Sequence, residues 1–348
     1  IFIDRDKEFY NDKVEFSKKL PYVKFKPNTE IRIRHYRGGP KEFEYTWNTD
    51  NFGFKNYKNI NLDDVNVLML GDSFTEGFGV KISDTISNQI AENSPFLPYN
   101  LGVQGYSISQ MRAVYQKYKK NFRYNFVILN YLAGTYSREQ IIENQLKNND
   151  EIIGAGGIFD VATASVNDEV RNSAFFISSA LWTSTKFLRK NIARKIKGIE
   201  YDDKRMNIYP SIKFDIENKD YNNFSNKSFS KFLSEIIKIK EISKSDNTQM
   251  IFVYYINRSM AYYQKATGKL LPNKVFNERD AIQEFCKKNN IHFLDISNDL
   301  IDYVIQLKTN DNENYNSLPF LKRDAHLSPV GNSIVAKSII NKLRKVEK

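Results

Sequence analysis

The chain has 348 residues, of which 41% are hydrophobic and 27% charged, which is enough apolar material for a large core. Its net charge of +11 indicates either a solvated lysine-rich surface or attraction to an anionic partner, such as a phospholipid or an acidic glycan of a cell envelope. We expect no nucleic-acid partner, because the sequence has no zinc-finger spacing, no RNP signature and no basic region that leads into heptads.

One cysteine, Cys286, lies in a helical pattern, so neither an intrachain disulfide nor a cysteine-based metal site can form. We expect no cofactor and no metal, since the sequence holds no phosphate-binding or dinucleotide motif and no cluster of histidine and carboxylate ligands. Its apolar stretches fall short of the ~18 residues of a membrane-spanning helix. Because the chain opens with Ile1, we expect a removed signal peptide or anchor, and an extracytoplasmic or membrane-anchored location rather than a cytoplasmic one. The oligomeric state is left open.

In chain order, short β-branched runs alternate with amphipathic helices. The predicted strands are Val65–Leu70, Pro98–Val103, Asn125–Tyr131, Met250–Tyr255 and Ile291–Leu294. The predicted helices are Asp84–Asn93, Ser107–Lys120, a segment from Phe229 to Ile242, Phe276–Asn289 and a last helix that begins at Ser328-Pro329, an N-cap residue followed by proline. This alternation predicts an α/β domain over residues 63–348, with a parallel sheet covered by helices on both faces. Ligands of such sheets lie beyond the carboxyl ends of the strands.

Two segments depart from this alternation. Residues 1–62 are rich in aromatic and charged side chains, alternate like a strand at Glu30–His35 and contain a turn at Gly38–Pro40, which predicts a small β-rich extension. Residues 140–225 predict a mostly helical insertion. Its basic, aromatic-bearing run Phe175–Lys197 predicts a helix packed on the core, with a membrane-surface helix as the alternative.

Two polar segments stand where the chemistry of such a sheet is expected. Ser73 lies in Gly71–Gly77 (GDSFTEG), directly after the first buried strand, on a chain that must turn sharply. Asp324 stands two residues before His326, just ahead of the last helix, so its carboxylate can reach the imidazole Nδ1 and leave Nε2 free to act as a base. The chain's other two histidines, His35 and His292, lie in the extension and in a predicted strand, where a structural role is expected.

Together, the segments Gly71–Gly77 and Asp324–Asn332 (DAHLSPVGN) resemble the two sequence blocks of the SGNH, or GDSL-like, hydrolases in order and separation. The resemblance covers roughly residues 63–140 and 226–348. It implies a three-layer, flavodoxin-like fold and a catalytic set of Ser73, His326 and Asp324 that needs no cofactor.

The resemblance also implies an oxyanion hole with three donors. The first two are the N–H of Ser73 and a glycine N–H after the second strand, which is Gly105 or alternatively Gly102. The third is an asparagine after the third strand, but this chain reads Ala133-Gly134-Thr135-Tyr136-Ser137, so Thr135 or Tyr136 stands in its place. Three arginines near strand ends or the histidine are further candidates for holding an anionic or glycan substrate: Arg138, Arg258 and Arg323.

These residues predict a serine-dependent esterase that removes a short acyl group, such as acetyl, from a carbohydrate or lipid ester. One alternative is an O-acyltransferase that delivers the acyl group to a glycan of the cell envelope. The other is a binding protein on the same scaffold with weakened catalysis, which the missing asparagine favours.

Overall fold

The computed structural model describes residues 14–17, 22–35, 43–147, 216–217, 227–307, 317–321 and 324–347. The predicted turn Gly38–Pro40 lies outside these ranges. So does most of the predicted insertion at 140–225, including the run Phe175–Lys197. The division of the chain at residue 62 stays a prediction.

The core of the molecule is a five-stranded parallel sheet of order β6-β5-β7-β8-β9. Its strands are β5 (Val67–Leu70), β6 (Pro98–Asn100), β7 (Phe126–Leu132), β8 (Gln249–Tyr255) and β9 (His292–Asp295). Numbered along the chain, this order is 2-1-3-4-5, the order of flavodoxin-like doubly wound sheets. The predicted fold class is therefore confirmed.

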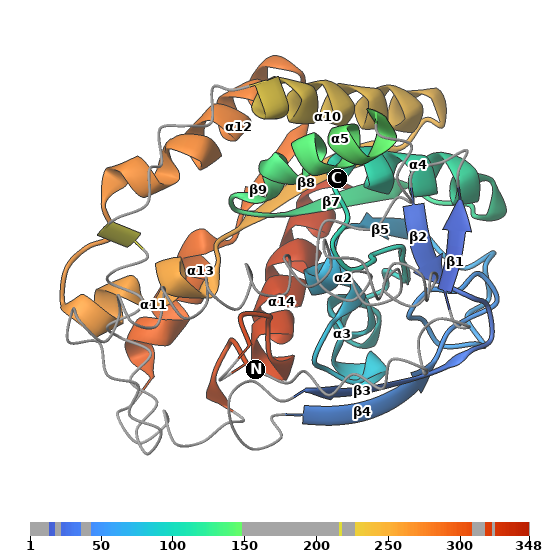
Figure 1. Ribbon diagram of the computed structural model, residues 1–348, viewed down its shortest axis with the longest axis horizontal. Coiled ribbons are helices and arrows are strands. Elements are labelled where there is room, and N and C mark those ends of the chain that lie inside the picture. Colours follow the sequence, from blue (N-terminus) through green and yellow to red (C-terminus); the bar gives the residue numbers. More distant parts are fainter. Residues whose placement is uncertain are drawn as a thin grey trace, which may run out of the picture.

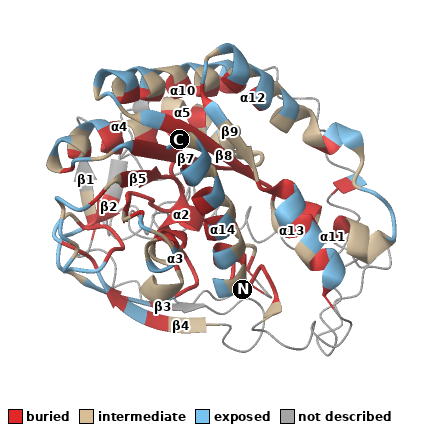
Figure 2. Cartoon of the chain, turned by 180° about the vertical axis from the view of Figure 1, so that it is seen from behind, coloured by how far each residue is buried: buried red, intermediate tan, exposed pale blue. Residues whose placement is uncertain are grey.

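Helices cover both faces of the sheet (Figure 1). One layer contains α4 (Ile108–Tyr118), α5 (Arg138–Lys147), α10 (Lys227–Ser245) and α12 (Asn277–Lys288). The other contains α3 (Ile86–Asn93), α13 (Ser297–Gln306) and α14 (Pro329–Val346), with α11 (Arg258–Thr267) packed on α13. Figure 2 shows β5, β7 and β8 almost wholly buried while the helices expose their outer faces. None of the helices in the described ranges is long and apolar enough to cross a membrane.

Local chemistry explains where the elements begin and end. As predicted, α14 starts at Pro329, and the Ser328 hydroxyl accepts a hydrogen bond from Gly331 N–H. Helix α3 begins two residues later than predicted, because the Thr85 side chain caps it by accepting from Asn88 N–H. Strand β6 is three residues shorter than predicted, since the chain after Asn100 turns to form a loop at the carboxyl edge of the sheet.

The part of the chain before the sheet forms two antiparallel hairpins, as its β-rich composition predicts. Strand β1 (Val14–Ser17) pairs with β2 (Tyr22–Phe25), and β3 (Glu30–His35) pairs with β4 (Phe43–Asn48). The predicted strand Glu30–His35 is confirmed residue for residue. Side chains from this region, such as Trp47 and Phe54, belong to the same hydrophobic cluster as the sheet residue Val67.

Polar side chains join this region to the edge of the sheet. The buried Asp50 carboxylate accepts hydrogen bonds from Asn56 Nδ2 (2.9 Å) and from the Tyr99 hydroxyl. The Asn56 amide in turn accepts from Asn100 N–H (2.9 Å) and donates to Asn100 O (3.0 Å). The Asn56 side chain thus forms hydrogen bonds with the N–H and carbonyl oxygen of Asn100, which edge strand β6 would otherwise leave unpaired.

The one cysteine of the chain reports on the integrity of this core. Cys286 lies fully buried on α12, and burial raises the pKa of its thiol to about 12. The thiolate is the reactive form, so the native protein should react with iodoacetamide at pH 8 more than about 100-fold more slowly than the urea-unfolded chain. Mass spectrometry of the alkylated protein measures both rates. Similar rates in the two states would contradict this placement of α12.

Candidate active site

Three loops that follow β5, β6 and β7 meet at the carboxyl edge of the sheet. Strand β5 lies between β6 and β7, and the connections from β5 and β7 leave toward opposite sides of the sheet. In doubly wound folds this point is where ligands bind. The loop after β5 carries Ser73, the loop after β6 carries Gly105, and the loop after β7 leads to Arg138.

Ser73 opens a single helical turn, α2 (Ser73–Glu76), directly after β5. Asp72 is its N-cap and accepts from Phe74 N–H (3.0 Å), while Gly77 ends the turn in a left-handed conformation (φ 84°) that favours glycine. Gly71 admits no side chain, because an added Cβ would lie 1.9 Å from the Thr75 hydroxyl oxygen. These constraints explain why glycine stands on both sides of this turn.

The structure brings Ser73, His326 and Asp324 together. Ser73 Oγ lies 2.7 Å from His326 Nε2, although the two residues are 253 positions apart in the chain. On the other side of the imidazole, Nδ1 is hydrogen-bonded to Asp324 Oδ1, which also accepts from His326 N–H (2.9 Å). With the ring proton on Nδ1, Nε2 is free to accept the hydroxyl proton of Ser73.

Neighbouring groups fix the histidine in this position. Its ring packs against the rings of Phe74 and Phe78, at centroid distances of 4.7 and 4.8 Å. Arg258 Nη1 donates to the carbonyl oxygens of Asp324 (2.9 Å) and Leu321 (3.1 Å). Arg258, predicted to hold substrate, therefore braces the loop that carries the acid and the base.

The loop after β6 is tied to the Ser73 turn by buried hydrogen bonds. Glu76 accepts from Gln104 N–H (2.8 Å) and from Gln104 Nε2 (2.9 Å). Asn100 Nδ2 donates to Thr75 O (2.8 Å), and its side-chain oxygen accepts from Gly102 N–H (2.9 Å). Gly102, the alternative to Gly105 as a backbone donor, therefore already donates its N–H to the Asn100 side chain.

Two backbone N–H groups at the carboxyl edge of the sheet remain available to donate a hydrogen bond. Within the described part of the chain, neither Ser73 N–H nor Gly105 N–H has a hydrogen-bond acceptor. Gly105 adopts φ 71°, a left-handed conformation. Both residues are buried, and a buried N–H without an acceptor is costly unless a ligand or water receives it. Ser73 and Gly105 are the two positions at which the resemblance implies backbone donors.

The loop after β7 is engaged elsewhere. The Thr135 hydroxyl donates to Leu132 O (2.8 Å), so its single proton is already used. Glu278, at the start of α12, accepts from Gly134 N–H (3.0 Å) and from the Tyr131 hydroxyl. The Tyr136 ring packs edge-on against Phe229 on α10. The expected third donor at Thr135 is therefore not supported by its hydrogen bonding, because local acceptors take the available protons.

The remaining sequence candidates fall in different places. Arg138 reaches the Ser73 turn, where its Nη1 forms an ion pair with Asp72 Oδ2 (2.7 Å). Arg323 lies outside the described residues. His292 begins β9 at the opposite, amino-terminal edge of the sheet and contacts Gln249 (3.1 Å), and His35 ends β3. His292 therefore does not belong to the group around Ser73.

A buried lysine, Lys55, holds the end of the Ser73 turn through hydrogen bonds. Lys55 Nζ donates to the carbonyl oxygens of Gly77 and Val80 (2.7 Å each) and lies over the rings of Tyr45 (4.5 Å) and Trp47 (5.3 Å). Burial lowers the pKa of Lys55 to about 7, although the nearby Glu76 opposes this effect. Burial also raises the pKa of Glu76. The sequence motif contains Glu76, but its partners in space could not be read from it.

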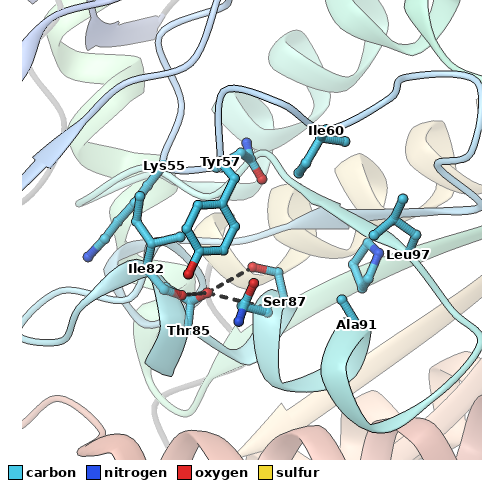
Figure 3. A pocket seen from close by; sticks show the side chains of 11 residues that line it. Lys55, Tyr57, Ile60, Ile82, Thr85, Ser87, Ala91 and Leu97 are labelled. Carbon is cyan, nitrogen blue, oxygen red and sulfur yellow. Dashed lines mark hydrogen bonds between the residues drawn. The ribbon is translucent and has the colours of Figure 1, made fainter.

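A pocket of about 60 Å³ lies beside α3. Tyr57, Ile82 and Thr85 are among the residues that line it (Figure 3). None of Ser73, Asp324 and His326 lines it, so this hollow is separate from the candidate site. In the described residues no group of three or more His, Cys, Asp and Glu side chains could hold a metal ion.

The arrangement defines the class of site: a serine whose hydroxyl contacts a histidine held by a carboxylate, at the ligand-binding edge of a doubly wound sheet. No family model and no curated protein matches the sequence. Solved structures with a similar fold include an acetylxylan esterase from Geobacillus stearothermophilus, at 8% identity over 82% of this chain and 96% of that one (TM-score 0.41). They also include a GDSL-like lipase from Bacteroides thetaiotaomicron, at 13% identity over 81% and 89% (TM-score 0.39).

A third similar structure is the psychrotrophic esterase EstA from Pseudoalteromonas sp., at 10% identity over 81% of this chain and 98% of that one (TM-score 0.38). Of the three descriptions, that of the Bacteroides thetaiotaomicron protein names the GDSL-like class that the two motifs resemble. At such identities and TM-scores, any chemistry assigned to this chain must come from its own residues.

Removing the Glu76 carboxylate should break its hydrogen bonds to Gln104 and destabilise the fold. In Glu76→Ala, the N–H and amide of Gln104 lose their acceptor, so the free energy of unfolding should fall by about 2–4 kcal/mol. Urea denaturation followed by circular dichroism measures the change. Glu284→Ala, which removes an exposed carboxylate paired with Lys288, is the control and should cost under about 0.5 kcal/mol. Equal effects of the two variants would contradict this assignment.

Proposed function

We propose that the protein is a serine-dependent esterase that removes a short acyl group, such as acetyl, from a carbohydrate or lipid ester. The observation that carries the proposal is the hydrogen-bonded series Ser73–His326–Asp324 beside two backbone N–H donors. The similar acetylxylan esterase suggests a test substrate and no more.

In the first half of the reaction, Ser73 Oγ attacks the ester carbonyl carbon while its proton passes to His326 Nε2. The negative charge that forms on the carbonyl oxygen is stabilised by the N–H groups of Ser73 and Gly105. When the C–O bond to the alcohol breaks, His326 gives its proton to the leaving oxygen. The acyl group is then bound to Ser73 as an ester.

In the second half, a water molecule attacks the acyl carbon and gives a proton to His326 Nε2. Collapse of the second tetrahedral intermediate breaks the bond to Ser73 Oγ, which takes the proton back from His326. The products are a carboxylic acid and an alcohol. Asp324 keeps the imidazole oriented and stabilises its charged form in both halves.

The first test is the loss of the nucleophile. Ser73→Ala should lower kcat for p-nitrophenyl acetate by at least about 10⁴-fold, because no acyl-enzyme can form. A fluorophosphonate reagent should add its mass to the wild-type protein and leave the variant unlabelled. Ser87→Ala, a buried serine on α3, is the matched control and should keep the wild-type rate. Undiminished turnover by Ser73→Ala would end the proposal.

The second test concerns the carboxylate. Asp324→Asn preserves an acceptor for His326 N–H but favours the wrong ring tautomer, so kcat should fall by about 10³–10⁴-fold. The measurement is steady-state kinetics at pH 7.5, with circular dichroism to verify the fold. A change under tenfold would show that Asp324 only positions the loop.

A second candidate function delivers the same acyl group to a sugar hydroxyl. The net charge of +11 favours it, since a positive surface suits an anionic polymer of the cell envelope, and an extracytoplasmic or anchored location would fit that role. A product that forms only when the acceptor glycan is present, detected by mass spectrometry, distinguishes transfer from hydrolysis. Glycan binding without fluorophosphonate labelling would favour the catalytically weakened binding protein.

A further inference from the structure

Arg138, the first residue of α5, extends its side chain to the two loops that carry the backbone donors. Its Nη1 donates to Asp72 Oδ2 (2.7 Å) and to Tyr106 O (3.1 Å). Asp72 immediately precedes Ser73, and Tyr106 immediately follows Gly105. The guanidinium therefore bridges the Ser73 turn and the loop after β6, which contain the N–H groups of Ser73 and Gly105.

The same guanidinium has further donors to offer. A guanidinium carries five N–H groups, and both protons of Nη1 are used in the two bonds above. In the described residues, Nε and Nη2 of Arg138 have no hydrogen-bond partner. The side chain is 18% exposed while Asp72 is 2% exposed, so the ion pair lies mostly out of water with one side still accessible.

Arg138 stands a few residues beyond the position where the resemblance implies an asparagine donor. Thr135 or Tyr136 holds that position, and the proton of the Thr135 hydroxyl goes to Leu132 O. Both residues belong to the chain that leaves β7. Over its described residues, the chain after β7 therefore supplies no side-chain amide donor to the site. It does supply the guanidinium of Arg138, whose Nε and Nη2 protons are not used in the bonds above.

We propose that Arg138 is the third oxyanion donor of this site, its Nε and Nη2 protons stabilising the charge that develops on the ester carbonyl oxygen. This inference rests on the proposed function and names a residue for it. Because Asp72 already balances the guanidinium charge, the donor should act on the charge of the transition state more than on neutral substrate. Its removal should therefore lower kcat and leave KM nearly unchanged.

The competing role is structural, in which Arg138 only clamps the two loops. The chain supplies a matched control in Arg112, on α4, which pairs with the buried Glu235 at 2.5 Å and is 25% exposed. Arg138→Gln and Arg112→Gln each break one ion pair between a partly exposed arginine and a buried carboxylate. Similar falls in melting temperature are expected from the two changes.

The experiment measures the rate of fluorophosphonate labelling of Ser73 by intact mass, together with kcat and KM for p-nitrophenyl acetate. Arg138→Gln should lower the labelling rate and kcat by about 10²–10³-fold with KM within about threefold, whereas Arg112→Gln should stay near wild type. In Arg138→Ala, added guanidinium chloride at about 50 mM, a concentration far below those that unfold proteins, should restore part of the rate.

Each other outcome overturns the inference. If Arg138→Gln loses no more activity than Arg112→Gln, Arg138 is not a donor, while the proposed function stands. If the loss follows the fall in melting temperature and guanidinium restores none of it, the residue is a structural clamp. If the wild-type protein is neither labelled nor active while remaining folded, the proposed function fails and takes this inference with it.

Discussion

The site depends on the buried junction between the Ser73 turn and the loop after β6. Glu76 receives two hydrogen bonds from Gln104, and Asn100 donates to Thr75 O. Because these groups are cut off from water, breaking any one bond leaves a polar group unsatisfied at a cost of about 1–3 kcal/mol. The two loops are therefore held in one arrangement. The N–H groups of Ser73 and Gly105 are therefore held in fixed positions, and the proposed reaction would not have to assemble them.

The sheet was predictable from the sequence because its inner strands β5, β7 and β8 are buried on both faces and appear as short, continuous apolar runs, such as Val67–Leu70. The last helix was predictable because Ser328 and Pro329 act locally. Helices α11 and α13 were not predicted, although Asn257 caps the first and Ile301 and Val304 lie on the buried face of the second. In both cases the signal is one short amphipathic segment, which composition alone does not separate from a loop.

In the candidate site, too, some features were predictable from the sequence and others were not. The motifs point to Ser73, Asp324 and His326 because their residue types and order are distinctive. The hydrogen bonds around them were not predictable, since they depend on pairs far apart in the chain. Glu278, 144 residues after Gly134, occupies the loop after β7, and Arg138 reaches back 66 residues to Asp72. Thr135 shows the consequence: a hydroxyl in the expected position is a donor only if no nearer acceptor takes its proton.

Lys55 shows how the β-rich region contributes to the same arrangement. It carries the only side-chain ammonium that, in the described residues, donates to the carbonyl oxygens at the end of the Ser73 turn. Burial lowers its pKa, so the ammonium loses its proton at a lower pH than an exposed lysine would. The neutral amine still has two N–H groups, which are enough for the bonds to Gly77 O and Val80 O. The support therefore survives the loss of the charge, and what deprotonation removes is the attraction to the Tyr45 and Trp47 rings and to Glu76.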